Sequence, residues 1–283
     1  MQGTPFSEEK EKIRIWLERQ GYAEKTILEN QRKLTQLIKW LSLKNKQTLE
    51  QLNNQLIKKY LKKLEKRLSP TTIRAHYGLI KMIDKYYQKM QNKKLLTQNI
   101  KIPKAENPKI EILTEQEISK LYKNTEDTIL GYRDRVILGL YYGCGLRSSE
   151  GQNLKEEDIN HTNKLIHIKK SKNHRNRYVP MSKKVQEDII KYQKYSRPHL
   201  IQKNTNYLLL NQNTGKNLKG YTLRTRVQKL AKKANINKRV NLHQLRHSIA
   251  SHLLQKGMEI EQIAQFLGHR DLASTQIYTH IKT

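Results

Sequence analysis

Residues 243–254 read HQLRHSIASHLL, and this run decides how the carboxyl-terminal half of the chain is expected to fold. Its spacing of apolar residues predicts a helix over about residues 244–256, with His243 at the start. Residues three positions apart lie on one face of a helix, so the His243 imidazole and the Arg246 guanidinium point the same way. The run therefore predicts an imidazole and a guanidinium side by side.

A second run, LGHRDLASTQIYTH, follows at residues 267–280. Gly268 can end one helix in a left-handed turn, because glycine has no Cβ to clash there. His269 then lies just past that helix end. Asp271 can cap the next helix, which presents Tyr278 from its far part. The end of the chain is therefore predicted to add a second imidazole and a phenol to the first pair.

Another cation is expected upstream of these runs. An apolar helix is predicted over about residues 133–142, and it ends at the glycines of Gly143-Cys-Gly145. Arg147 follows this helix end directly, a place from which a side chain is often aimed into a cleft. Glu150, three residues later, is expected to orient its neighbours rather than to react.

Between residues 164 and 181 the periodicity changes from helical to alternating, with LIHI before a polar turn and RYVP after it. This change predicts a β-hairpin. Its turn offers Lys172. Lys169 and Lys170 lie on the same hairpin and stay open as alternatives for any role given to Lys172.

The remaining sequence completes a two-domain organisation. Residues 8–95 read as four amphipathic helices, and from about residue 97 to 112 the pattern lapses into an extended linker that contains prolines. We expect a helical domain over residues 1–104, including the linker from about 97, and a second domain over residues 105–283. The fold is predicted to be mainly α-helical, with a small β-sheet or hairpin in the carboxyl-terminal domain.

The charge balance points to a polyanionic partner. The chain has 56 Lys and Arg residues against 25 Asp and Glu residues, a formal net charge of +31. A charge of this size repels itself unless a polyanion compensates it. The basic residues are spread along the chain rather than gathered in one amphipathic anchor, which favours nucleic acid over a membrane surface. The alternative is a Lys- and Asn-rich composition with solvated helix faces.

Other features argue against metals, disulfides and membranes. The single cysteine, Cys144, excludes an intramolecular disulfide and a multi-cysteine zinc site. His243 and His247 have the spacing of a zinc pair, but no carboxylate or thiol pattern nearby completes it. No apolar run approaches the ~20 residues that span a bilayer, and the amino terminus lacks a signal-peptide layout. We expect a cytoplasmic, nucleoid-associated protein with no cofactor and no small-molecule substrate.

Four runs of this sequence resemble the tyrosine recombinase (phage integrase) family, and its Xer-type members in particular. They are GLRSSEGQNLKEEDI at 145–159, SKNHRNRYVP at 171–180, HQLRHSIASHLL at 243–254 and LGHRDLASTQIYTH at 267–280. Each alone is a modest signal, but all four occur in order behind a helical domain similar to the family's core-binding domain. The resemblance is strong over residues 113–283 and weak over residues 8–95.

The resemblance implies a site-specific recombinase that cleaves and rejoins DNA through a 3′-phosphotyrosine intermediate. Carried over by motif, it implies six residues around the scissile phosphate: Arg147, Lys172, His243, Arg246, His269 and Tyr278. It also implies that the two domains form a C-shaped clamp around duplex DNA, and that a homo- or hetero-tetramer assembles on two DNA sites. It implies neither a metal ion nor ATP, because a phosphotyrosine conserves the energy of the broken bond.

Physical chemistry gives these residue types matching roles. Attack on a phosphodiester develops negative charge on the non-bridging oxygens, which Arg147 and Arg246 can bind bidentately. The nucleophile, a phenol with a reference pKa of about 10, needs a base and a cationic field before it attacks. We expect His243 to be that base and His269 to donate to a phosphate oxygen. Lys172 is expected to protonate the departing 5′-oxygen.

Three other functions stay open at this point. A type IB topoisomerase or a hairpin telomere resolvase shares the tyrosine and arginine chemistry, although the Xer-like spacing argues against both. The third is a non-catalytic DNA-binding regulator, because Ile260 through Tyr278 also resembles a helix-turn-helix with Gly268 in the turn. A plain repressor has no need for Arg147, His243 and Arg246 together.

Two features depart from the family pattern. Leu242 stands where many relatives have proline, which is expected to alter only the approach to the helix. The last residue, Thr283, follows Tyr278 by five positions, whereas Xer-type proteins usually continue into a helix that docks on the next subunit. We therefore expect subunits to couple through something shorter or through another surface. The motifs specify the chemistry. They do not specify the target sequence, the biological task or any need for accessory proteins.

Overall fold

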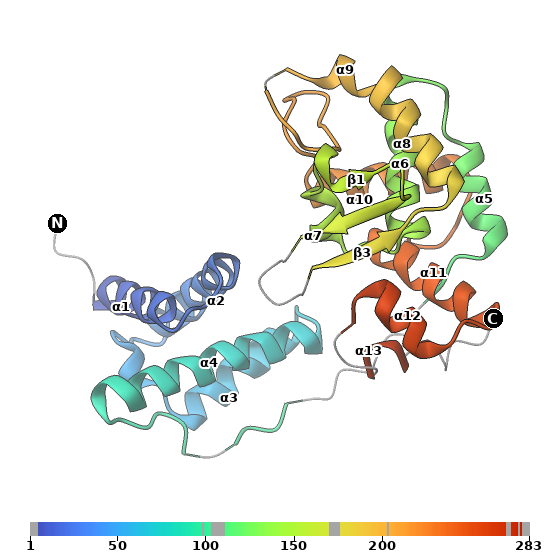
Figure 1. Ribbon diagram of the computed structural model, residues 1–283. Helices are drawn as coiled ribbons and strands as arrows, with labels where there is room; N and C mark the ends of the chain where they lie inside the picture. Colours follow the sequence, from blue (N-terminus) through green and yellow to red (C-terminus); the bar gives the residue numbers. More distant parts are fainter. Residues whose placement is uncertain are drawn as a thin grey trace. The chain divides into compact units, whose positions relative to one another are not determined.

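The computed structural model describes residues 5–97, 99–102, 111–169, 176–202, 204–269, 273–276 and 278. The chain divides into two compact units, Met1–Pro108 and Lys109–Thr283, coloured blue to teal and green to red in Figure 1. The domain boundary predicted between residues 104 and 105 lies outside the described residues.

The first unit is a bundle of helices, in agreement with the four amphipathic segments predicted over residues 8–95. Its elements are α1 (Pro5–Arg19), α2 (Glu24–Ser42), the short 3₁₀ turn η1 (Leu49–Gln51), α3 (Asn54–Glu65) and α4 (Pro70–Gln91). Local sequence signals set where the later helices begin. The side chains of Asn53 and Ser69 accept hydrogen bonds from backbone amides of α3 and α4, and Pro70 takes the first position of α4.

Apolar side chains from all four helices meet in one core. Leu17, Leu34, Ile57 and Ile83 are fully buried, and the rings of Trp16 and Tyr86 pack edge to face. The opposite face of α3 carries exposed lysines: Lys58, Lys59, Lys62 and Lys63. The amphipathic pattern therefore separates an apolar core from a basic surface within this unit.

The second unit is built mainly of helices, with a small sheet at one side. Its first half contains α5 (Glu115–Lys123), α6 (Ile129–Leu138), the π-turn η2 (Gly139–Gly143), α7 (Ser148–Gln152), the 3₁₀ turn η3 (Glu156–Asp158), β1 (Ile159–Asn160), β2 (Leu165–Ile168) and β3 (Arg177–Pro180). Its second half contains α8 (Lys183–Tyr195), α9 (Arg197–Leu200), α10 (Gly220–Lys233), α11 (Leu242–Gln255), α12 (Ile260–Leu267) and α13 (Ala273–Gln276). The predicted mainly helical fold with a small sheet is confirmed.

The three strands pair antiparallel in the order β1-β2-β3. Ile166 faces Val179 across the pair that the alternating pattern predicted, and both side chains are fully buried. Strand β1 was not predicted, because two residues are too short to show an alternation. The turn with Lys172 lies outside the described residues, as does Asp271, the predicted cap of the last helix.

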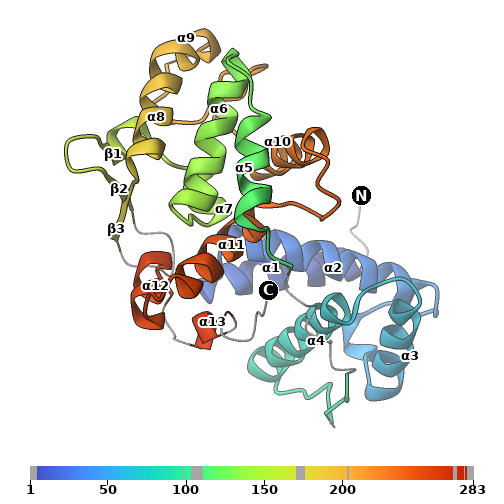
Figure 2. The same ribbon diagram turned by 90° about the vertical axis from the view of Figure 1, so that its right-hand side faces the viewer.

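Helix α6 lies at the centre of this unit. It packs against α8 and α10, and the turn η2 that continues it packs against α11 (Figure 2). Both views show α11, α12 and α13 together at one end of the unit. Helix α11, which holds the run 243–254, thus meets the turn that follows α6, and Leu267 at the end of α12 lies against Gly145 just beyond that turn. None of the helices in the described part of the chain is long and apolar enough to span a membrane.

Candidate active site

The backbone turns sharply between the end of α6 and Arg147. The amide of Cys144 donates to the carbonyl of Gly139 at 2.9 Å, which widens the last turn into a π-turn. Gly145 follows with a φ of +56°, and a Cβ there would lie 2.8 Å from a methyl group of Leu267. Glycine is required at 145 both for its left-handed backbone and for the close approach of α12.

Three hydrogen bonds then fix Arg147 at the start of α7. Its backbone amide donates to Oε2 of Glu150 at 2.8 Å, and its Nη1 donates to Oε1 of the same carboxylate at 2.9 Å. Its Nη2 donates to the carbonyl of Gly268 at 2.6 Å. These contacts agree with the expectation that Glu150 orients its neighbours.

A second guanidinium, that of Arg177 at the start of β3, shares the same carboxylate. Its Nη1 and Nη2 donate to Oε1 and Oε2 of Glu150 at 2.8 and 2.9 Å. Burial by itself would raise the pKa of Glu150, but the hydrogen bonds from Arg177 and Arg147 outweigh it and lower the pKa to about 2. Glu150 is therefore a buried carboxylate between two cations.

A third guanidinium, that of Arg246 on α11, is held by backbone carbonyls instead. Its Nη1 donates to Gly145, and its Nη2 donates to Leu267 at 2.9 Å. The side chain is 4% exposed, and burial followed by the charge of Arg147 lowers its pKa to about 10. The predicted pair, Arg147 and Arg246, thus lies close enough for each charge to act on the other.

The phenol of Tyr278 is buried beside two histidines. Its hydroxyl lies 2.9 Å from Nδ1 of His247, and its ring stacks on that of His269 with centroids 6.5 Å apart. Tyr278 is 2% exposed, and burial raises the pKa of its hydroxyl while the charges of Arg246 and Arg147 lower it. Both predicted guanidiniums therefore act on the predicted nucleophile.

The histidines around the phenol are kept neutral by their surroundings. Burial, followed by nearby cations, lowers the pKa of His247 and of His269 to about 4 each. Nδ1 of His269 lies 2.8 Å from the Thr275 hydroxyl, which fixes the ring. The side chain of His243 is exposed, yet partial loss of hydration and then the charges of Arg246 and Arg147 lower its pKa.

The structure therefore brings together five of the six predicted residues, Arg147, His243, Arg246, His269 and Tyr278, while Lys172 lies outside the described residues. Two neighbours were missed. His247 was considered only as half of a zinc pair, although its place beside Arg246 marked it as a neighbour of the site. Arg177 gave no signal beyond its position in the predicted hairpin. No cluster of three potential metal-ligating His, Cys, Asp or Glu side chains occurs among the described residues.

Comparisons with known proteins place this chain in one family. The model of the phage integrase family matches residues 111–283, and the model of the phage integrase N-terminal SAM-like domain matches residues 13–74. The chain belongs to the phage integrase family. Its curated relatives carry the names of Xer tyrosine recombinases.

Three of these relatives show how far the similarity extends. Tyrosine recombinase XerC of Oceanobacillus iheyensis is 35% identical over 64% of this chain, and the match spans 60% of that protein. XerA of Pyrococcus horikoshii is 35% identical, with 80% of this chain and 75% of XerA covered. XerC of Bacillus pumilus is 30% identical, with 92% and 87% covered.

Solved structures with the same fold include recombinases in complex with DNA. XerH bound to palindromic difH substrate in a post-cleavage complex superposes with a TM-score of 0.73 and 23% identity, covering 90% of this chain and 76% of XerH. The Tn1549 transposon integrase in complex with transposon right end DNA gives a TM-score of 0.75 and 20% identity, covering 97% and 95%. At these identities the structures show a shared fold.

Proposed function

We propose that this chain is a site-specific recombinase that cleaves and rejoins duplex DNA, with Tyr278 as its covalent nucleophile. One observation carries the proposal: the phenol of Tyr278 is buried close enough to two guanidiniums, those of Arg147 and Arg246, for their charges to act on its hydroxyl. The two arginines come from separate parts of the sequence. Family membership, the net charge of +31 and the exposed lysines of α3 support DNA as the partner.

In the proposed cleavage step, Oη of Tyr278 forms a bond to the scissile phosphorus and the bond to the 5′-oxygen breaks. Arg147 and Arg246 bind the non-bridging oxygens, where negative charge grows. The donors are preorganised, because carbonyls and the Glu150 carboxylate already hold both guanidiniums in place. His269 is assigned to donate to a phosphate oxygen.

Proton transfers complete the step. In the structure, neutral His247 faces the phenol. Burial raises the pKa of that phenol and lowers the pKa of His247 to about 4, so proton transfer from Tyr278 to His247 is uphill in the resting protein. We therefore assign His247 to holding the resting phenol. His243 keeps its predicted role as general base once a phosphate is bound, and Lys172 that of general acid toward the 5′-oxygen. Rejoining is the reverse reaction with the 5′-hydroxyl of another strand.

The wider assembly follows the same proposal. We propose that the two units correspond to a helical DNA-binding domain, residues 1–104, and a catalytic domain, residues 105–283, which close around duplex DNA as a C-shaped clamp. Recombination requires two sites, so we propose a tetramer, either homomeric or heteromeric, acting on DNA in the cytoplasm. A topoisomerase would instead relax a plasmid that lacks any specific site.

A nicked suicide substrate tests the function. Duplexes that the protein selects from a random pool are nicked close to the scissile phosphate, so that the short fragment is lost after cleavage and the adduct is trapped. The wild-type protein is expected to form a covalent DNA adduct that withstands denaturant, and Tyr278→Phe is expected to form none. An adduct in Tyr278→Phe would remove the assignment of the nucleophile. Tight specific binding with no adduct from the wild type would favour a regulator.

A further inference from the structure

Arg177 touches both groups that hold the guanidinium of Arg147. It donates two hydrogen bonds to the Glu150 carboxylate. It also packs on Gly268, where a Cβ would lie 2.8 Å from Nε of Arg177. Glu150 and the Gly268 carbonyl are the two acceptors of the Arg147 guanidinium. Arg177 therefore contacts both residues that hold Arg147.

The position of Arg177 is itself well fixed. The residue opens β3 and faces Ile168 across the antiparallel pair. Its side chain is 13% exposed, so it lies inside the unit rather than on a solvated face. The two parallel hydrogen bonds to Glu150 also fix the orientation of the guanidinium against the carboxylate. Arg177 therefore connects the sheet rigidly to the start of α7.

The charges of Glu150 and Arg177 affect how strongly Arg147 attracts a phosphate. Glu150 with Arg147 alone would form a neutral pair, and the carboxylate would cancel much of the attraction of Arg147 for an anion. With Arg177 present, two guanidiniums share one carboxylate, and the group of three carries one net positive charge. Arg177 thus allows Glu150 to orient Arg147 without neutralising it.

We propose that Arg177 is a positioning residue for strand cleavage, acting through Glu150 and Gly268 so that Arg147 meets the scissile phosphate with its charge and orientation intact. The inference rests on the proposed function, in which Arg147 binds that phosphate. Arg177 itself touches no reacting atom.

The first test is single-turnover cleavage of a nicked duplex selected from a random pool, at saturating protein. Arg177→Met is expected to lower the rate by about 10- to 100-fold, somewhat less than the loss of a direct oxyanion donor, with DNA affinity changed by less than about threefold. The matched control is Arg226→Met, because Arg226 forms a similar bidentate pair with buried Asp134 on α6, away from these residues. Because Asp134 loses its partner in this variant, rates are compared under conditions where both variants are folded, and the rate of Arg226→Met is then expected to stay within about threefold of wild type. Equal rates for the two variants would overturn the proposal.

A double substitution tests the charge argument. If Arg177→Met is slow because Glu150 then neutralises Arg147, removing the carboxylate charge with Glu150→Gln in the same protein restores part of the rate. We expect the double variant to cleave at least about fivefold faster than Arg177→Met alone, because coupled residues are non-additive. A double variant as slow as Arg177→Met, or slower, would contradict the argument that Arg177 acts by preserving the charge of Arg147.

A methylphosphonate substrate separates the proposed role from a loss of folded protein, because a loss of folded protein lowers cleavage of both substrates equally. A methylphosphonate at the scissile position carries no negative charge, so its cleavage depends less on the cation of Arg147. The loss caused by Arg177→Met, or by Arg177→Lys if the first variant fails to fold, is expected to shrink at least about fivefold on this substrate. An equal loss on both substrates would contradict the inference. The proposed function is judged separately, by the adducts of the wild type and Tyr278→Phe.

Discussion

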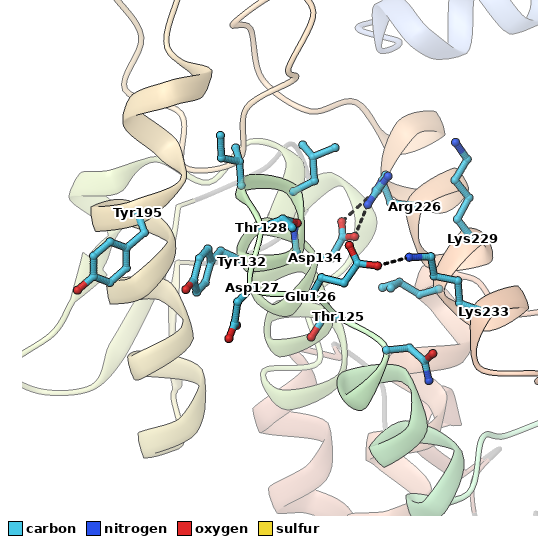
Figure 3. A pocket seen from close by; sticks show the side chains of 15 residues that line it. Thr125, Glu126, Asp127, Thr128, Tyr132, Asp134, Tyr195, Arg226, Lys229 and Lys233 are labelled. Atoms are coloured by element: carbon cyan, nitrogen blue, oxygen red, sulfur yellow. Dashed lines mark hydrogen bonds and ion pairs between the residues drawn. The ribbon is translucent and has the colours of Figure 1, made fainter.

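Two groups of charged side chains in the carboxyl-terminal unit are built from the same kind of ion pair and differ in how the charges are shared. One lines a cavity of about 670 Å³ beside α6 and α10. Figure 3 shows Arg226 reaching Asp134 there, and Lys233 reaching Glu126. Asp127, on the same wall, pairs with Arg135. Each carboxylate in this cavity has a cation of its own.

The other group is the candidate active site. There Glu150 is shared by Arg147 and Arg177, and Arg246 is hydrogen-bonded to the carbonyls of Gly145 and Leu267. Carbonyl dipoles hold a guanidinium in place without cancelling its charge. Under the proposed function, an excess of cations over carboxylates, rather than a large cavity, marks the site that binds the scissile phosphate.

The substitution Arg246→Met is expected to have the largest effect on the cleavage rate. Removing one preorganised donor to the growing oxyanion is expected to lower the single-turnover rate by about 10²- to 10³-fold. Arg226→Met removes a cation from the group beside α6 and α10 in which each carboxylate has its own cation, called here the balanced group. This variant should leave the rate within about threefold of wild type. If both variants cleaved DNA equally well, the distinction between the two groups would be lost.

The next effect is a pH dependence of stability. The folded-state pKa of Glu150 is about 2, below its usual 4.5, so its contribution to the free energy of unfolding is fully present above pH 4.5 and disappears as the pH falls toward 2. The difference in stability between wild type and Glu150→Gln should therefore shrink by roughly 3 kcal/mol over this range. Urea unfolding between pH 2 and 6 measures it. A difference that does not change with pH would mean that Glu150 is not held between two cations.

Two glycines with left-handed backbones form a smaller, matched test. Gly257 has a φ of +86° and nothing within 4 Å of the point where a Cβ would lie, whereas Gly268 has a φ of +67° with Arg177 at 2.8 Å from that point. Alanine at 257 is expected to cost about 1 kcal/mol from backbone strain. Alanine at 268 should cost about 1–3 kcal/mol more, because Arg177 must move, and should also slow cleavage. Equal costs and unchanged cleavage would show that the contact with Arg177 is unimportant.

The smallest effect is expected in the balanced group, for Lys233→Met. The ion pair between Lys233 and Glu126 is exposed, and such pairs contribute little to the free energy of unfolding. Thermal unfolding and cleavage should both stay close to wild type. A large loss of cleavage would mean that the cavity beside α6 and α10 takes part in the reaction.

The sequence predicted the elements better than the contacts between them. Helices with an apolar stripe and the alternating hairpin were predictable, because their periodicity reports burial directly. The short α7, α9 and β1 were not, since five residues or fewer show no period. The motif runs pointed to six side chains, of which five lie together and the sixth, Lys172, lies outside the described residues. Which groups hold them was not predictable, because the bond from Arg177 to Glu150 depends on how a strand packs against a helix.

The hydrogen bond between His247 and Tyr278 teaches the same point. The two residues are 31 positions apart, and only the packing of α11, α12 and α13 brings them together. From the sequence alone, the spacing of His243 and His247 is also compatible with a zinc pair. Tertiary packing, rather than spacing, gives His247 its partner.

The most direct test of the account is to find which atom of the protein carries the DNA. The trapped adduct is digested with trypsin and nuclease, and the modified peptide is sequenced by mass spectrometry. We predict a nucleotide linked through its 3′-phosphate to Tyr278, with no other tyrosine modified. A 5′-linkage, or a link to any other residue, would contradict the account.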